Sequence, residues 1–148
     1  MKQLQLSGYA IELKKEIGES RYQMMSDHLK AETGYSIEEL EQGITIVKMD
    51  FSCAMQHILT GLRGCYIHGS KQLWLRNTEN SETIIHEFVH VAQWRRKGII
   101  NAFQKRLTSF ANIMANNGFR FFYNCDYYER EARNIAKKYL RINNINED

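Results

Sequence analysis

The sequence contains no proline and only three cysteines among its 148 residues. The cysteines, Cys53, Cys65 and Cys125, are odd in number and far apart, and none belongs to a C-x-x-C pair. This spacing gives no indication of a cysteine-based zinc site or a redox dithiol, so we expect reduced thiols. Stability must then come from the packed core rather than from disulfide bonds.

Long hydrophobic runs are also missing. No apolar stretch approaches the roughly 18 residues that a membrane-spanning helix needs. Residues 1–16 have no apolar segment before their charges begin, so they do not have the pattern of a secretory signal. We therefore expect a cytoplasmic protein without a membrane partner.

The chain has no strong excess of charge of one sign. Its 20 basic and 17 acidic residues give a formal net charge of +3, which is too small to predict nucleic-acid binding by itself. Hydrophobic residues make up 43% of the sequence and charged residues 25%, close to the average for globular proteins. We expect a single domain over residues 1–148 and leave its oligomeric state open.

Apolar periodicity and turn residues predict an α+β fold. The expected elements are helices over 9–31, interrupted at Gly18, and 36–43, a strand over 44–51, a hairpin of 63–70 and 71–77, and helices over 82–97, 99–116 and 126–142. This order predicts a small antiparallel sheet packed beside a helical half. Residues 1–60 form an N-terminal part of unknown role, and residues 71–142 carry the candidate site.

Local sequence signals predict the N-terminal caps of two helices and the buried face of a third. Ser36 is expected to cap the short helix, with Glu39 in the capping-box position. Ser81 is expected to cap the helix that follows it. The last helix has an apolar stripe of Tyr128, Ala132, Ile135, Tyr139 and Ile142.

The clearest chemical signal is His86-Glu87-Phe88-Val89-His90, an H-E-x-x-H motif inside a predicted helix. Residues i and i+4 of a helix share one face, so the two imidazoles can converge on one ion. Neutral imidazole nitrogens suit zinc. Glu87 points to the side of such an ion, where it can accept a proton from an activated water as a general base.

The surroundings of the motif favour a metal site over a chance pair of histidines. The apolar neighbours predict a largely buried helix; they are Ile84, Ile85, Phe88, Val89, Val91 and Ala92. One polar line, formed by His86, His90, Gln93 and Lys97, runs through that surface, and buried polar groups need partners. The alternative is an amphipathic helix whose polar face includes two histidines.

A catalytic zinc usually has three protein ligands, so a third must come from elsewhere in the chain. No histidine follows His90, and Gln93 and Arg96 stand where the extended H-E-x-x-H-x-x-G-x-x-H pattern requires Gly and His. The downstream candidates are Cys125, Asp126, Glu129 and Glu131. The upstream histidines are less favoured; they are His28, His57 and His68.

Of these candidates we prefer Glu129. It shares a helix flank with Ala132 and Ala136, and such small residues allow close approach to the helix of the histidines. Glu131 is the alternative third ligand. Otherwise it is a solvated charge or a partner that orients a histidine.

With HEFVH on one helix and a glutamate on a later one, the chain resembles the gluzincin class of zinc metallopeptidases. Over residues 71–136, HEFVHVAQW followed by YYEREAR is similar to small single-domain bacterial and phage proteins of peptidase type. Arg133 replaces the Asp of the common E-x-x-A-D form. The resemblance implies a zincin-like fold, one zinc ion per chain on His86, His90 and Glu129, and hydrolysis of peptide or protein substrates.

The same resemblance implies further parts of a peptidase site. A tyrosine would stabilise the oxyanion, with Tyr123, Tyr127 and Tyr128 as candidates. The substrate would add a strand to a sheet edge, which we expect to be residues 71–77. Within that segment we expect Trp74 and Leu75 to be core residues rather than substrate contacts.

Two other functions stay open. One is a zinc-binding assembly or interaction protein without catalysis, although a structural site is normally closed by four protein ligands. The other is a nucleic-acid-associated module, indicated by the basic cluster of Arg95, Arg96, Lys97, Lys105 and Arg106.

Overall fold

In the computed structural model, the described residues are 8–50, 64–67, 69–96 and 127–146. They form an α+β arrangement, as predicted. The elements are β1 (Gly8–Ala10), α1 (Leu13–Ile17), α2 (Glu19–Thr33), α3 (Ile37–Glu41), β2 (Thr45–Met49), β3 (Gly64–Ile67), β4 (Gln72–Leu75), a helix over 81–96, and α7 (Tyr127–Asn143). The predicted helix over 99–116 lies outside the described residues.

The sheet is mixed, so the prediction of an antiparallel sheet was wrong. Its strand order is β1-β2-β4-β3. The pairs β1–β2 and β3–β4 are antiparallel, but β2 and β4 are parallel, with Ile46 opposite Leu73. A hairpin can dock on a neighbouring strand through either of its two strands, and apolar periodicity does not tell which one it uses.

The same docking places β4 inside the sheet. The expectation that residues 71–77 form an edge was therefore wrong, because β3 lies outside β4 and is the edge strand on that side among the described strands. Trp74 and Leu75 are buried, in agreement with the prediction that they are core residues. Leu73 and Leu75 join the main core with Ile46, whereas Trp74 packs with Val47 and Met49 in a second, smaller cluster.

The N-terminal helices are divided at Gly18, as predicted, where φ is +88° and an L side chain would be strained. Strand β1 was not predicted, because it has only three residues and all of them are exposed. The helix expected over 9–31 was wrong at its start, since Tyr9 and Ala10 belong to this strand and α1 begins only at Leu13. It is defined by its pairing with β2, which brings Gly8 so close that an added Cβ would lie 2.6 Å from the carbonyl oxygen of Lys48.

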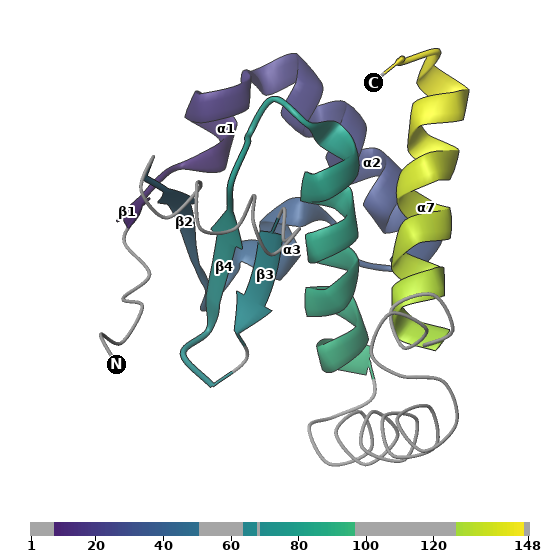
Figure 1. Ribbon diagram of the computed structural model, residues 1–148. Coiled ribbons are helices and arrows are strands. Elements are labelled where there is room, and N and C mark those ends of the chain that lie inside the picture. Colours follow the sequence, from purple (N-terminus) through teal and green to yellow (C-terminus); the bar gives the residue numbers. More distant parts are fainter. Residues whose placement is uncertain (1–7, 51–63, 68, 97–126, 147–148) are drawn as a thin grey trace, which may run out of the picture.

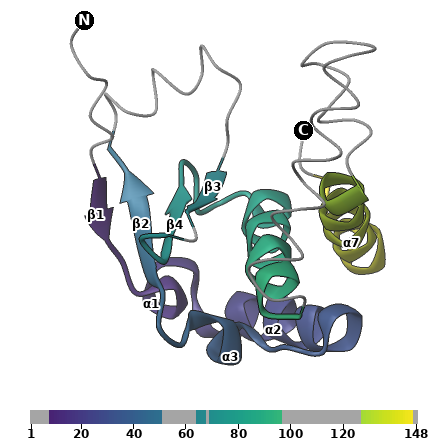
Figure 2. The ribbon, with the colours of Figure 1, turned by 90° about the horizontal axis from the view of Figure 1, so that it is seen from below.

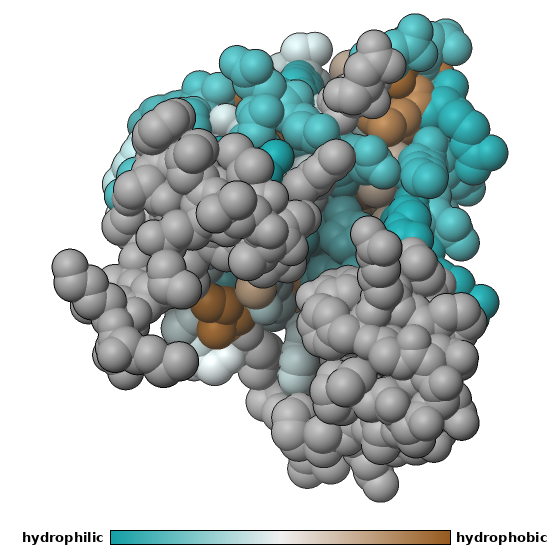
Figure 3. All heavy atoms as spheres, in the orientation of Figure 1, coloured by the Kyte–Doolittle hydropathy of each residue, from teal (hydrophilic) through white to brown (hydrophobic). Residues whose placement is uncertain are grey.

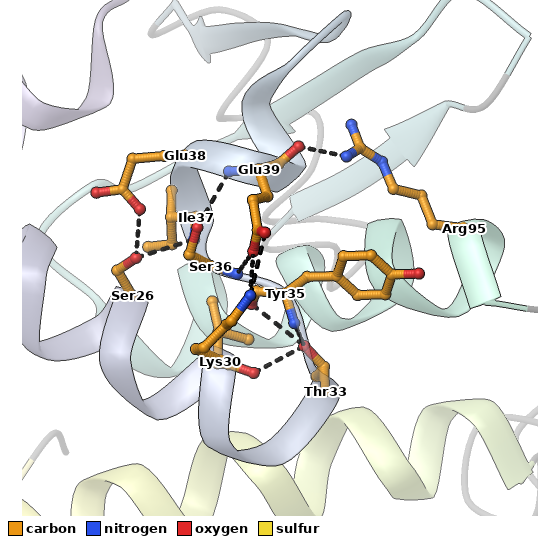
Figure 4. Close-up of polar contacts among 10 residues, drawn as sticks. Ser26, Lys30, Thr33, Tyr35, Ser36, Ile37, Glu38, Glu39 and Arg95 are labelled. Carbon is orange, nitrogen blue, oxygen red and sulfur yellow. Dashed lines mark hydrogen bonds and ion pairs between the residues drawn. The ribbon is translucent and has the colours of Figure 1, made fainter.

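Figure 4 shows how α3 begins with the predicted capping box. The Glu39 backbone N–H donates to Ser36 Oγ, and the Ser36 N–H donates to the Glu39 carboxylate at 2.7 Å. Lys30 in α2 donates to the same carboxylate. At the other end of α3, Arg95 donates to the backbone carbonyls of Glu39 and Leu40.

Helix 81–96 lies between the β3 edge of the sheet and α7, and α2 runs beneath it (Figures 1 and 2). The prediction that Ser81 caps this helix was wrong. The cap is Asn80, whose Oδ1 accepts from the Thr83 N–H at 2.8 Å. Ser81 is instead buried, and its hydroxyl accepts from Arg21 of α2. The six predicted apolar neighbours of the motif are all at most 1% exposed.

Helix α7 packs its apolar stripe on the main core, with Ala132, Ile135 and Tyr139 buried there. The prediction for Ile142 was wrong, since this residue is 62% exposed in the last turn. On the face drawn in Figure 3, most of the described surface is hydrophilic, with a hydrophobic area over the C-terminal part of α7. Among the described helices, none is both long and apolar enough to cross a membrane.

Candidate metal centre

Three potential metal ligands meet between helix 81–96 and the first turn of α7. His86 and His90 come from one face of the helix, one turn apart, and Glu129 faces them from α7. Their ligand atoms all lie within 4.8 Å of one another, and this is the cluster found among the described residues. This trio is the ligand set predicted from the sequence, and the structure brings it together.

The distances within this cluster are close to those of a zinc site. His86 Nε2 is 3.1 Å from Glu129 Oε2, His90 Nε2 is 3.2 Å from Glu129 Oε1, and the two Nε2 atoms are 3.1 Å apart. Ligand atoms bound to zinc at about 2.0–2.1 Å in a tetrahedron lie about 3.3–3.4 Å apart. Two imidazoles and one carboxylate are also a common donor set for a catalytic zinc.

The cluster is largely shielded from water. The exposed fractions of the side chains are 22% for His86, 9% for His90 and 13% for Glu129. Burial raises the pKa of Glu129, but the hydrogen bonds and charges of His86 and His90 outweigh it and hold the pKa well below its ordinary value. Glu129 is therefore an anion, the form that binds a metal ion.

His90 is oriented by a side chain that the sequence analysis did not assign to the site. Its Nδ1 lies 2.8 Å from Oε1 of Gln93, and Gln93 is only 2% exposed. Gln93 Nε2 in turn donates to the backbone oxygen of Tyr128 and to the carboxylate of Glu131. The signal was in the sequence, because Gln93 is three residues after His90 on the same polar line.

Glu131, the alternative third ligand, lies outside the cluster of three. One of its oxygens accepts from Gln93 at 2.8 Å and the other accepts from Arg96 at 3.0 Å. Its carboxylate thus contacts the partner of His90 rather than the two imidazoles. This placement matches the third role considered for Glu131, that of a partner orienting a histidine, although it acts through Gln93.

Glu87 directly follows the ligand candidate His86 in the helix and is only 6% exposed. Its side chain is directed at edge strand β3, where a Cβ added to Gly64 would be 2.7 Å from Cγ and 3.1 Å from Oε1 of Glu87. Gly64 therefore leaves the space that this carboxylate occupies. Gly64 was predicted to lie in a hairpin strand, but its closeness to Glu87 was not predicted.

Tyr127 is exposed and Tyr128 is buried, with their rings in edge-to-face contact, and neither position tests the prediction of an oxyanion donor. His28 is engaged elsewhere, since its Nε2 lies 2.9 Å from the backbone oxygen of Ile135. The other candidates lie outside the described residues; they are His57, His68, Tyr123, Cys125 and Asp126.

No family model, curated protein or solved structure matches the chain. Two imidazoles, an ionised carboxylate and a neighbouring buried carboxylate in H-E-x-x-H spacing can hold a divalent ion and move a proton beside it.

Proposed function

We propose that the protein is a zinc-dependent metallopeptidase with a zincin-like fold. The observation that carries this proposal is the convergence of His86, His90 and Glu129, at zinc-like spacing, beside the buried carboxylate of Glu87. A structural zinc site is normally closed by four protein ligands, whereas the three ligands found in the described part of the chain leave a position for water or substrate. The donor set thus favours catalysis over a purely structural ion.

The three ligands would hold one zinc ion per chain. Bound there, zinc supplies Lewis acidity, which polarises a carbonyl and lowers the pKa of water. Glu87 is the general base in this proposal: its carboxylate accepts a proton from the attacking water and later gives it to the leaving amine. Burial of Glu87 beside Gly64 keeps that carboxylate at a defined position between helix 81–96 and the start of β3.

The position of Glu87 also indicates where a peptide would bind. Its side chain contacts Gly64 at the start of β3, and β3 is the sheet edge next to helix 81–96 (Figure 1). An extended peptide can pair with such an edge through its backbone. In this arrangement the scissile bond would pass between the edge strand and the three ligands.

The observations favour a peptidase over the nucleic-acid alternative. Arg95 and Arg96 form part of the basic cluster that indicated nucleic acid, but both donate hydrogen bonds within the chain. Arg95 holds the carbonyls at the end of α3, and Arg96 pairs with Glu131. Their contacts therefore account for them without an external anion.

Glu87→Gln tests the proposal. The variant keeps the shape of the side chain and the three zinc ligands but removes the base. With a mixed peptide library and mass spectrometry, we expect the zinc-loaded wild type to cleave peptides and Glu87→Gln to lose about 10²–10⁴-fold in rate while keeping its zinc. Glu82→Gln, five residues earlier in the same helix, is the matched control and should cleave normally. Equal cleavage by Glu87→Gln and wild type would contradict the mechanism.

A further inference from the structure

A single buried amide connects the two helices that carry the metal ligands. Gln93 is 2% exposed, and all of its polar atoms have partners. Its Oε1 faces Nδ1 of His90 on its own helix. Its Nε2 faces two groups of α7, the backbone oxygen of Tyr128 at 3.0 Å and the carboxylate of Glu131 at 2.8 Å.

These partners determine which way the amide points. A backbone carbonyl and an ionised carboxylate can only accept hydrogen bonds, so the NH₂ group of Gln93 must face Tyr128 and Glu131. Its oxygen must then face His90. Because that oxygen is an acceptor, Nδ1 of His90 must carry the hydrogen.

The proton on Nδ1 has a direct consequence for the metal site. When His90 is charged, both ring nitrogens carry hydrogen, and Nε2 donates to Glu129. In the neutral imidazole, the hydrogen kept on Nδ1 by Gln93 leaves Nε2 with a free lone pair. That Nε2 atom is the one that faces His86 and Glu129 in the candidate centre. The amide therefore selects the tautomer of His90 that can bind a metal ion.

The chain also holds the amide in place. Arg96 donates to the second oxygen of Glu131 at 3.0 Å, so this carboxylate is fixed between Arg96 and Gln93. The contact with the Tyr128 carbonyl lies one residue before Glu129 on α7. The Gln93 side chain thus fixes the position of His90 relative to the α7 backbone next to Glu129.

We propose that Gln93 is a positioning residue of the metal centre, which fixes the Nδ1–H tautomer of His90 and is itself oriented by Glu131 and Arg96. The inference rests on the proposed metal site for its purpose, but the tautomer can be measured without metal. The proposed site then includes the three ligands and a hydrogen-bond network between helix 81–96 and α7.

The test combines a spectrum and a titration. Long-range ¹H–¹⁵N correlation spectra of the metal-free wild type, at alkaline pH where imidazoles are neutral, report which ring nitrogen of His90 carries hydrogen. We expect Nδ1–H. In Gln93→Met, which keeps the length of the side chain but has no acceptor, we expect the Nε2–H form to appear. Zinc affinity, measured by competition with a chromophoric chelator, should fall about 10–100-fold in this variant.

Gln72→Met is the matched control, because Gln72 is a half-buried amide of β4 whose Oε1 accepts from Trp74. It should bind zinc like the wild type. An Nε2–H tautomer in the wild type, an unchanged affinity in Gln93→Met, or an equal loss in Gln72→Met would each overturn the inference. If Gln93→Met does not fold, the wild-type spectrum decides alone. A wild type that binds no zinc contradicts the proposed function, whereas the tautomer still reports on Gln93.

Discussion

The side chain of Glu87 occupies the space that a Cβ at Gly64 would need, with Cγ of Glu87 only 2.7 Å from that position. A real Cβ essentially never comes this close to another heavy atom, so any larger residue at the start of β3 would force the Glu87 side chain to shift. The contact joins the edge strand to the proposed general base.

Gly64→Ala should therefore displace Glu87 while leaving the zinc ligands in place. We expect normal zinc content but a rate of peptide cleavage lower by about 10–100-fold, because a misplacement of about 1 Å can cost that much in catalysis. Zinc analysis and the peptide-library assay measure the two effects. Gly69→Ala is the control, since an added Cβ there meets no atom within 4 Å. Unchanged cleavage by Gly64→Ala would show that the Glu87 position is not critical.

Zinc binding should also stabilise the fold, because the ligands come from two helices that are far apart in the sequence. A ligand present at 100 times its Kd adds about 2.7 kcal/mol to the free energy of unfolding. For a chain of this size that corresponds to a rise in Tm of about 5–10 °C. Glu129→Ala should lose most of this rise. Thermal unfolding with zinc and with a chelator measures it, and an equal rise in Glu129→Ala would remove Glu129 from the ligand set.

The capping box of α3 gives a prediction for the pH dependence of stability. Lys30 and the Ser36 backbone N–H lower the pKa of Glu39 to about 2. Because this pKa is below the ordinary value, the stabilising contribution is fully present above about pH 4.5 and is lost as the pH falls through about 2. Urea unfolding should thus show Glu39→Gln less stable than wild type at neutral pH, with the difference shrinking as acid is added. A difference that stays constant down to pH 2 would contradict this assignment.

Much of the candidate site follows from local spacing in the sequence. His86 and His90 share a face because they are four residues apart in a helix, and that relationship does not depend on the rest of the fold. Glu129 could be preferred because Ala132 and Ala136 leave room for close helix packing, and both alanines are fully buried in the structure. Helical periodicity was therefore sufficient to predict that these residues lie in the candidate site.

Other features depend on contacts between distant segments. The pattern of β4 predicts buried side chains but not that β2 pairs with it in parallel, so the edge strand was assigned to the wrong segment. The hydrogen bonds of Gln93 to α7 require the two helices to be adjacent, which spacing within one helix cannot show. The close approach of Gly64 to Glu87 likewise depends on the position of β3, which the sequence pattern does not predict.

The most direct test of the account is the metal content of the pure protein, determined by elemental analysis for the wild type and four variants. We predict about one zinc ion per chain in the wild type and in Glu87→Gln, and a loss or strong weakening of binding in His90→Ala and Glu129→Ala. Glu131→Gln should keep its zinc, because its carboxylate contacts Gln93 and Arg96 rather than the imidazoles. Full zinc retention in Glu129→Ala with loss in Glu131→Gln would transfer the third ligand to Glu131, and a wild type without zinc would contradict the central claim.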